Sequence, residues 1–162
     1  EVVTASADRR EGGADWRCGG SVFSHVAYPR QLLLKGEILV DAFAHIGRMP
    51  LAETPVVTGS PEHGYRLRAR LHVRGSQIGF VREGSHDVCP VGPTGQMLPD
   101  TVRWIEAAQE RLRSDRLSGL ASIELAENAT ASERACHLEL EPGTPAMPFA
   151  ALAAAGSANG RM

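Results

Sequence analysis

Hydrophobic and polar residues alternate without a break between residues 66 and 74. The polar positions are Arg66, Arg68, Arg70, His72 and Arg74, and the positions between them are Leu67, Ala69, Leu71 and Val73. Successive side chains of a β-strand point to opposite faces of its sheet, so this period of two predicts a half-buried strand. Its polar face is a row of positive charge. Such a row is kept either because solvent and nearby acids screen it or because it binds an anion, and a solvated face is the commoner case.

Further strands surround this one. The turn RGSQ and the apolar run IGFVR predict a hairpin over residues 66–82, and HDVCPV predicts a third strand that ends at Pro90. EVVTA at residues 1–5 is another strand candidate, and LASIELAE with RACHLEL predicts a second hairpin. A helix is expected between the hairpins, from Asp100 as its N-cap to Arg116. The predicted class is therefore α+β, a mostly antiparallel β-sheet with packed helices.

A second helix is predicted earlier in the chain, where apolar residues recur at helical spacing and Gly47 marks the end. Its main stripe contains Leu32, Leu39, Phe43 and Ile46, and Gly36 weakens it by about 1 kcal/mol relative to alanine. Leu33, Leu34, Ile38 and Val40 widen the apolar surface beyond one stripe. We therefore expect this helix to have partners on more than one side.

Composition limits the function. The chain has 162 residues and a net charge of -2, which fits one globular domain and argues against a wholly basic nucleic-acid binder. No apolar run approaches the roughly 20 residues of a membrane span, so we expect a cytoplasmic protein. Cys18, Cys89 and Cys136 are odd in number and widely spaced, which favours three reduced thiols. The first residue is Glu1 and the last stretch is rich in small residues, which is typical of a piece of a longer protein.

Several blocks then match one family in order. CGG at residues 18–20, His25, Tyr28 and QLLLKGEILVDAFAHIG are followed by GYRLRARLHVR and IGFVREGSHDVCPV. Over roughly residues 1–140 the chain resembles the RNA (uracil-5-)-methyltransferases, and EVVTASADRR resembles the end of their RNA-binding TRAM domain. The resemblance implies the following segments: 1–11, the end of a TRAM-like domain; 12–27, a degenerate iron–sulfur segment; 28–47, a helix that packs on the catalytic domain; 48–141, a central RNA-facing domain; and 142–162, a linker toward the catalytic domain.

The family's cofactors transfer only in part. Many members hold an iron–sulfur cluster with four cysteines, but the matching positions here are Gly12, Cys18, Ser21 and Thr94. Since one thiolate cannot hold such a cluster, we expect none, and the six histidines lack the spacing of a zinc site. Members methylate uracil with S-adenosylmethionine on a further catalytic domain. No glycine-rich donor loop or catalytic cysteine segment is found here, so this chain alone is expected to be inactive and not to bind the cofactor.

The resemblance also changes the interpretation of the arginine row. A uracil in folded RNA must be extruded before methylation, and planar guanidinium groups suit the flanking phosphates. The predicted RNA-binding residues are Arg66, Arg68, Arg70, Arg74 and Arg82. Two hypotheses of different classes remain open at this point, and the loss of the cluster ligands leaves a third, a degenerate protein with no RNA role. The chain is either a substrate-binding part of a methyltransferase for ribosomal or transfer RNA, whose partners are the RNA and the missing TRAM and catalytic domains, or a stand-alone, non-catalytic RNA-binding module.

Overall fold

The computed structural model describes residues 6–11 and 14–155. The predicted strand at residues 1–5 and position 12 of the iron–sulfur pattern lie outside this part. The helices are α1 (Tyr28–His45), α2 (Pro99–Ser114) and α3 (Ala150–Ala155), with short 3-10 turns at Gly92–Thr94 and Met147–Phe149. The strands are β1 (Arg68–Arg74), β2 (Gln77–Val81), β3 (Val88–Pro90), β4 (Leu120–Glu127) and β5 (Arg134–Leu140). The order of elements matches the expected α+β class.

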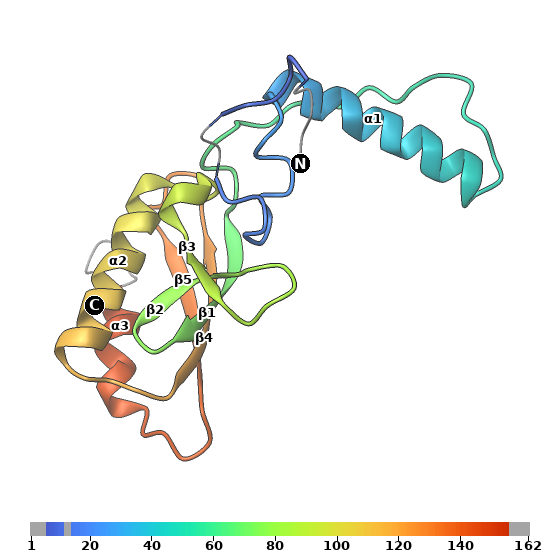
Figure 1. The fold of residues 1–162 in the computed structure, drawn as a ribbon. Helices are drawn as coiled ribbons and strands as arrows, with labels where there is room; N and C mark the ends of the chain where they lie inside the picture. The colour runs from blue at the N-terminus through green and yellow to red at the C-terminus, as the bar shows by residue number, and fades with distance from the viewer. Residues whose placement is uncertain (1–5, 12–13, 156–162) are drawn as a thin grey trace.

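The five strands form one antiparallel sheet with the order β3-β2-β1-β4-β5. β1 lies at its centre and pairs with β4 on the side away from its hairpin partner β2. Helices α2 and α3 cover one face of the sheet (Figure 1). Both helices contribute to the core, α2 through Ile105 and Leu112 and α3 through Leu152, and these side chains pack against Leu71 and Ile123 of the sheet. The opposite face of the sheet is left open over β1, β4 and β5.

Helix α2 differs from its prediction at the first turn. The helix begins at Pro99, its N-cap is Leu98, and no side chain caps it. Proline at this position presets the backbone angle of a first turn and needs no hydrogen-bond partner for its nitrogen. Asp100 is therefore not the N-cap. It lies in the first turn, where its carboxylate favours the positive end of the helix and pairs with Arg103.

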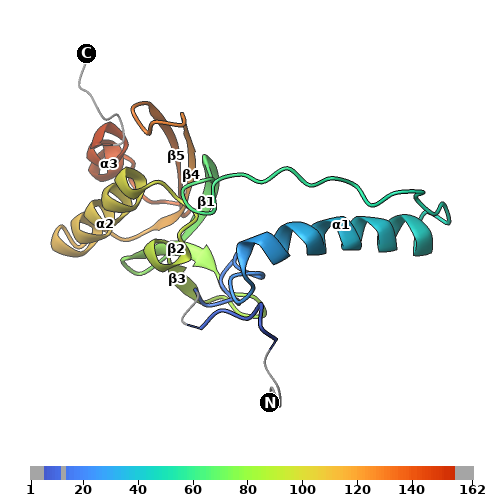
Figure 2. The same ribbon diagram turned by 90° about the horizontal axis from the view of Figure 1, so that it is seen from above.

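Helix α1 projects away from the sheet together with the segment that follows it (Figure 2). Gly36 is its only buried residue. A Cβ at Gly36 would lie 3.2 Å from the carbonyl oxygen of Pro55 and 3.2 Å from the side chain of Thr54. The glycine that the sequence marks as a weakness thus allows the following segment to run close along the helix. Leu33 and Ile46 are exposed at 60% and 85%.

The expected linker at residues 142–162 is ordered in part. Phe149 and Leu152 are each 3% exposed and belong to the core. The small residues around them form α3, which packs against α2 and β5. This segment therefore completes the core over one face of the sheet. Within residues 6–11 and 14–155, none of the helices has the length and apolar character needed to cross a bilayer.

Candidate nucleic-acid interface

The alternation along β1 is confirmed by burial. Leu71 and Val73 are 0% and 4% exposed and lie in the core. Arg68, Arg70 and Arg74 are exposed on the other face of the strand. The arginine row therefore lies on the face of the sheet that α2 and α3 do not cover.

Neighbouring strands bring acids to this face. Glu124 of β4 pairs with Arg70 of β1. Glu139 of β5 pairs with Ser122 of β4. The guanidinium of Arg70 lies 2.5 Å from a carboxylate oxygen of Glu139 and 3.9 Å from one of Glu124. Hydrogen bonds from Ser122 and Arg70 hold the pKa of Glu139 below its ordinary value. The sheet face is therefore mixed in charge, although the polar side chains of its central strand include three arginines and no acid.

Three of the predicted residues come together around one hollow. It has a volume of about 570 Å³ and is lined by Arg66, Arg68 and Arg70 along with parts of β4 and β5, including Glu124 and His137. Arg74 lies at the far end of β1, beside the turn, and its Nη1 bonds the carbonyl oxygen of its neighbour Val73. It lies six positions along the strand from Arg68, a distance of about 20 Å at 3.3 Å per residue. Arg74 and Arg82 do not line this hollow.

Arg66 is held differently from the rest of the row. Its Nη1 donates to Oε1 of Gln96 at 2.5 Å, and its guanidinium carbon lies 5.0 Å from the centre of the Phe80 ring. Its Nε also approaches the carbonyl oxygen of Arg68 at 3.4 Å. Phe80 is 4% exposed, so its ring belongs to the core and supports the arginine rather than offering a free stacking surface.

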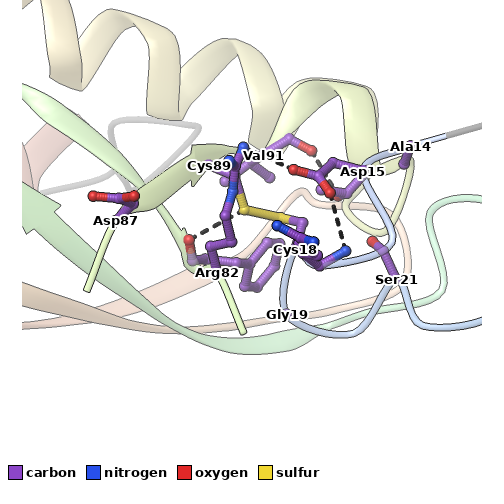
Figure 3. Close-up of a disulfide and its surroundings, with 12 residues drawn as sticks. Ala14, Asp15, Cys18, Gly19, Ser21, Arg82, Asp87, Cys89 and Val91 are labelled. Carbon is purple, nitrogen blue, oxygen red and sulfur yellow. Dashed lines mark hydrogen bonds and ion pairs between the residues drawn. A yellow bond between two sulfur atoms is a disulfide. The ribbon is translucent and has the colours of Figure 1, made fainter. Parts of the chain in front are cut away.

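Arg82, which follows β2, binds the segment that precedes α1. Its Nη2 lies 2.7 Å from Asp15, and its backbone forms a β-bridge with Cys18 (Figure 3). The same bridge brings Cys18 next to β3, where a disulfide joins it to Cys89 across a Cα–Cα distance of 6.1 Å. Arg82 therefore contributes to the attachment of residues 14–27 more directly than to the open sheet face.

The disulfide corrects the prediction of three reduced thiols. Cys18 and Cys89 are 2% and 4% exposed and form a bridge, and only Cys136 is a free cysteine among the described residues. Wide spacing in the sequence did not prevent the pairing, because the β-bridge at Arg82 places the two segments side by side. Cys136 lies on the partly buried side of β5, and burial raises the pKa of its thiol to about 11.

The residues around the disulfide do not fit a four-cysteine iron–sulfur cluster. The sulfur of Cys18 is bonded to Cys89, the hydroxyl of Ser21 accepts a hydrogen bond from Gln96, and the hydroxyl of Thr94 donates to the carbonyl oxygen of Val91. Iron–sulfur clusters require several thiolate ligands, which this set lacks. Over residues 6–11 and 14–155, no group of three or more histidine, cysteine or acidic side chains is placed to hold a metal ion.

A larger hollow has Gly20 in its lining. Its volume is about 670 Å³, and it is lined by the segment before α1, by α1 itself and by residues 60–65, including Lys35 and Tyr65. Arg10 and Glu62 form an ion pair at its wall. Tyr65 is 44% exposed, so its ring is accessible from solvent. This hollow was not anticipated from the sequence, because its walls come from segments that show no shared pattern.

Sequence reasoning also missed Gln96, Glu124 and Glu139. Gln96 stands in the loop TGQML, which has no motif or periodicity that marks a buried residue. The two acids alternate correctly on their own strands, and only the pairing of β1 with β4 and of β4 with β5 brings them to the arginine row. The disulfide had one available signal, since the resemblance implies that residues near positions 18 and 94 meet in space.

The chain is similar in sequence to enzymes named 23S rRNA (uracil(1939)-C(5))-methyltransferase RlmD. The protein from Pseudomonas entomophila is 30% identical over 148 residues, which is 80% of this chain and 33% of that protein. The one from Methylococcus capsulatus is 40% identical over 77 residues, covering 46% of this chain and 17% of its own length. The Bordetella pertussis protein is 40% identical over 94 residues, 54% of this chain and 20% of that protein. No protein-family model matches the chain.

A solved structure shares the fold. The crystal structure of Pyrococcus abyssi tRNA (uracil-54, C5)-methyltransferase in complex with S-adenosyl-L-homocysteine aligns with a TM-score of 0.62 and 23% identity. The alignment covers 92% of this chain and 36% of that protein. The chain thus spans about a third of the length of the Pseudomonas entomophila protein and of the Pyrococcus abyssi enzyme. Together, the ordered motifs and the sequence relatives show that this chain is homologous to a segment of the RNA (uracil-5-)-methyltransferases, and the solved structure shows that the fold is shared.

Proposed function

We propose that this chain is the substrate-binding part of an S-adenosylmethionine-dependent RNA (uracil-5-)-methyltransferase that acts on ribosomal or transfer RNA in the cytoplasm. Its own contribution is to grip the RNA backbone near the target uridine through Arg66, Arg68 and Arg70, with Arg74 further along the strand. The methyl donor and the reacting groups would be held by parts of the enzyme outside these 162 residues. Alone, the chain is expected to bind RNA without methylating it.

The observation that carries this proposal is the hollow on the open sheet face. Three arginines from one short stretch line it, and none of its lining residues comes from α2 or α3. Guanidinium groups are planar, always charged and able to fork onto phosphate oxygens. Arg68 has no acid within 4 Å among the described residues, so its charge is available to a ligand. Glu124, which lines the hollow, and Glu139, which pairs with Arg70, restrict the site, because they would repel a phosphate placed beside Arg70.

The test is binding of a fluorescein-labelled oligouridylate, measured by fluorescence anisotropy at several salt concentrations. Each arginine that neutralises a phosphate releases condensed counterion, so the log–log slope should be about -0.7 per contact for single-stranded RNA. Replacing Arg66, Arg68 and Arg70 together by alanine should therefore remove up to about two units of slope. It should also weaken binding to all sequences alike, because phosphate contacts carry no base information.

A matched control removes the same charge elsewhere. Arg103, Arg111 and Arg113 are exposed on α2, on the covered side of the sheet, and they pair only with acids of the same helix or its end. Their triple replacement by alanine should leave the slope unchanged if the open face binds the RNA. Equal slopes for the wild type and the Arg66, Arg68, Arg70 variant would instead mean that the row is a solvated face.

A further inference from the structure

Gln96 is a buried amide whose three hydrogen bonds define its orientation. Gln96 is 1% exposed. Nε2 donates to the carbonyl oxygen of Gly19 at 2.9 Å and to the hydroxyl of Ser21 at 3.3 Å. A carbonyl oxygen can only accept, so the amide nitrogen must face Gly19 and the amide oxygen must face the other way. That oxygen, Oε1, accepts from Nη1 of Arg66 at 2.5 Å.

The contact orients Arg66 without neutralising it. Arg70 and Arg82 are each held by carboxylates, from Glu139 and Asp15. Arg66 is held by a neutral amide and by the ring of Phe80, neither of which carries an opposite charge. A guanidinium has five N–H groups, and the bonds to Gln96 and to the carbonyl oxygen of Arg68 use one hydrogen each from Nη1 and Nε. Within the described part of the chain, both hydrogens of Nη2 and the second of Nη1 have no partner and can bind phosphate oxygens.

The loop of residues 18–21, which accepts the hydrogen bonds of the Gln96 amide nitrogen, is closely packed. A Cβ on Gly20 would lie 2.4 Å from Oε1 of Gln96 and 2.6 Å from Nη1 of Arg66, and Gly20 has a φ of +84°. Only glycine allows the backbone to pass this close in that conformation. The disulfide from Cys18 to Cys89 anchors the same loop to β3, two residues before Gly20. The loop, the amide and the arginine therefore form one connected unit.

This inference rests on the proposed RNA-binding function of Arg66. We propose that Gln96 is a positioning residue, which aims the guanidinium of Arg66 at an RNA phosphate and leaves its full charge for that contact. Gly20 and the disulfide hold the loop that orients Gln96. An amide is suited to this task because it accepts a hydrogen bond at fixed geometry while remaining neutral at every pH of interest.

The experiment compares Gln96→Met in the wild-type chain and in the Arg66→Ala chain, using the same oligouridylate and anisotropy readout. Methionine has a similar length and no hydrogen-bonding amide. In the wild type, Gln96→Met should weaken binding by about fivefold, the effect of losing one oriented hydrogen bond. In the Arg66→Ala chain it should have no further effect, because the residue it acts through is gone. Gln109→Met is the matched control, since Gln109 bonds the backbone nitrogen of Ile78 and not an arginine of the row.

Gln96→Glu tests the role of the neutral charge and also decides the matter if Gln96→Met does not fold. Glutamate keeps an oxygen that can hold Arg66 but adds a negative charge beside it. We expect the salt slope to become shallower by about 0.7, the value of one phosphate contact. An unchanged slope, or an equal loss of affinity for Gln96→Met in both backgrounds, would overturn the positioning role while RNA binding stands. If Arg66→Ala itself leaves the affinity unchanged, the RNA-binding role of Arg66 is wrong and this inference falls with it.

Discussion

Arg70 and Arg66 line the same hollow, but the groups around Arg70 are acidic and those around Arg66 are neutral. Arg70 lies against the carboxylate of Glu139 and near that of Glu124, whereas Arg66 lies against an amide and an aromatic ring. Exposed ion pairs contribute little to stability, typically less than about 1 kcal/mol. Their larger effect here is on ligand binding, because each acid competes with a phosphate for the same guanidinium.

Replacing Glu139 by glutamine should therefore strengthen RNA binding. The glutamine oxygen can still accept the hydrogen bond from Ser122, and Arg70 is released from its carboxylate partner. We expect the affinity for oligouridylate to rise roughly two- to fivefold, the range of an exposed ion pair. The salt slope should steepen by up to about 0.7 if Arg70 gains a phosphate.

Glu110→Gln is the control for this change. Glu110 pairs with Arg113 on the exposed side of α2, so the substitution alters the net charge equally but far from the row.

Lower pH should affect RNA binding in the same direction as Glu139→Gln does. The pKa of Glu139 is lowered in the folded state, so its pairing and the stability that it adds are present above pH 4.5 and are lost as the pH falls through that lower pKa. Weaker or unchanged binding by Glu139→Gln would show that Arg70 does not contact the RNA.

Helix α1 is the element with the least support from the rest of the chain. Gly36 is its only buried residue, and Leu33, Ile38 and Phe43 are exposed at 60%, 52% and 38%. The relatives are about three times as long as this chain, and the resemblance implies that this helix packs on a further domain. Its apolar surface in the isolated chain is therefore a site for association.

We predict that the isolated chain self-associates through α1 and that the double substitution Leu33→Glu, Ile38→Glu reduces this. Light scattering over a range of protein concentrations measures the apparent mass. Ala107→Glu, on the exposed side of α2, is the control, because it adds negative charge to a helix whose apolar side is already packed. A wild-type chain that stays monomeric at the highest concentration would contradict the prediction.

At the scale of the whole molecule, the disulfide between Cys18 and Cys89 cross-links two distant parts of the chain. It joins the segment before α1 to β3 across 71 residues and so encloses α1, the following segment and the first hairpin in one loop. Closing a loop of this length reduces the entropy of the unfolded chain, and disulfides typically add about 2–4 kcal/mol. Both cysteines are buried, so the folded chain shields the bond from solvent reductants.

Replacing Cys18 and Cys89 together by alanine should lower the free energy of unfolding by about 2–4 kcal/mol, measured by urea denaturation. Cys136→Ala should lower the free energy of unfolding by less, because it breaks no cross-link.

Thiol titration in denaturant should find one reactive thiol per chain without reductant and three after reduction. In the folded chain Cys136 should react slowly at pH 8, since a pKa of about 11 leaves little thiolate. Three thiols without reductant would show that the bridge does not form.

The local features of this protein were determined by its sequence. The alternation of β1, the hairpin of β1 and β2, the full extents of β4 and β5 and the course of α1 all follow from periodicity and turn residues. The α+β class followed from the order of these elements, and the family from motifs that stand in one order along the chain. Each of these signals lies within a few residues of the element that it specifies, so it can be detected without knowledge of any long-range contact.

The tertiary structure alone decided which distant residues meet. Cys18 bonds Cys89 over 71 residues, Arg70 meets Glu139 over 69, and Arg66 meets Gln96 over 30. The small-residue stretch after β5 forms α3 because Phe149 and Leu152 find a place in the core. None of these contacts has a periodic signal, because each depends on how strands pair and how loops cross, and that pairing is chosen by the packing of the whole chain.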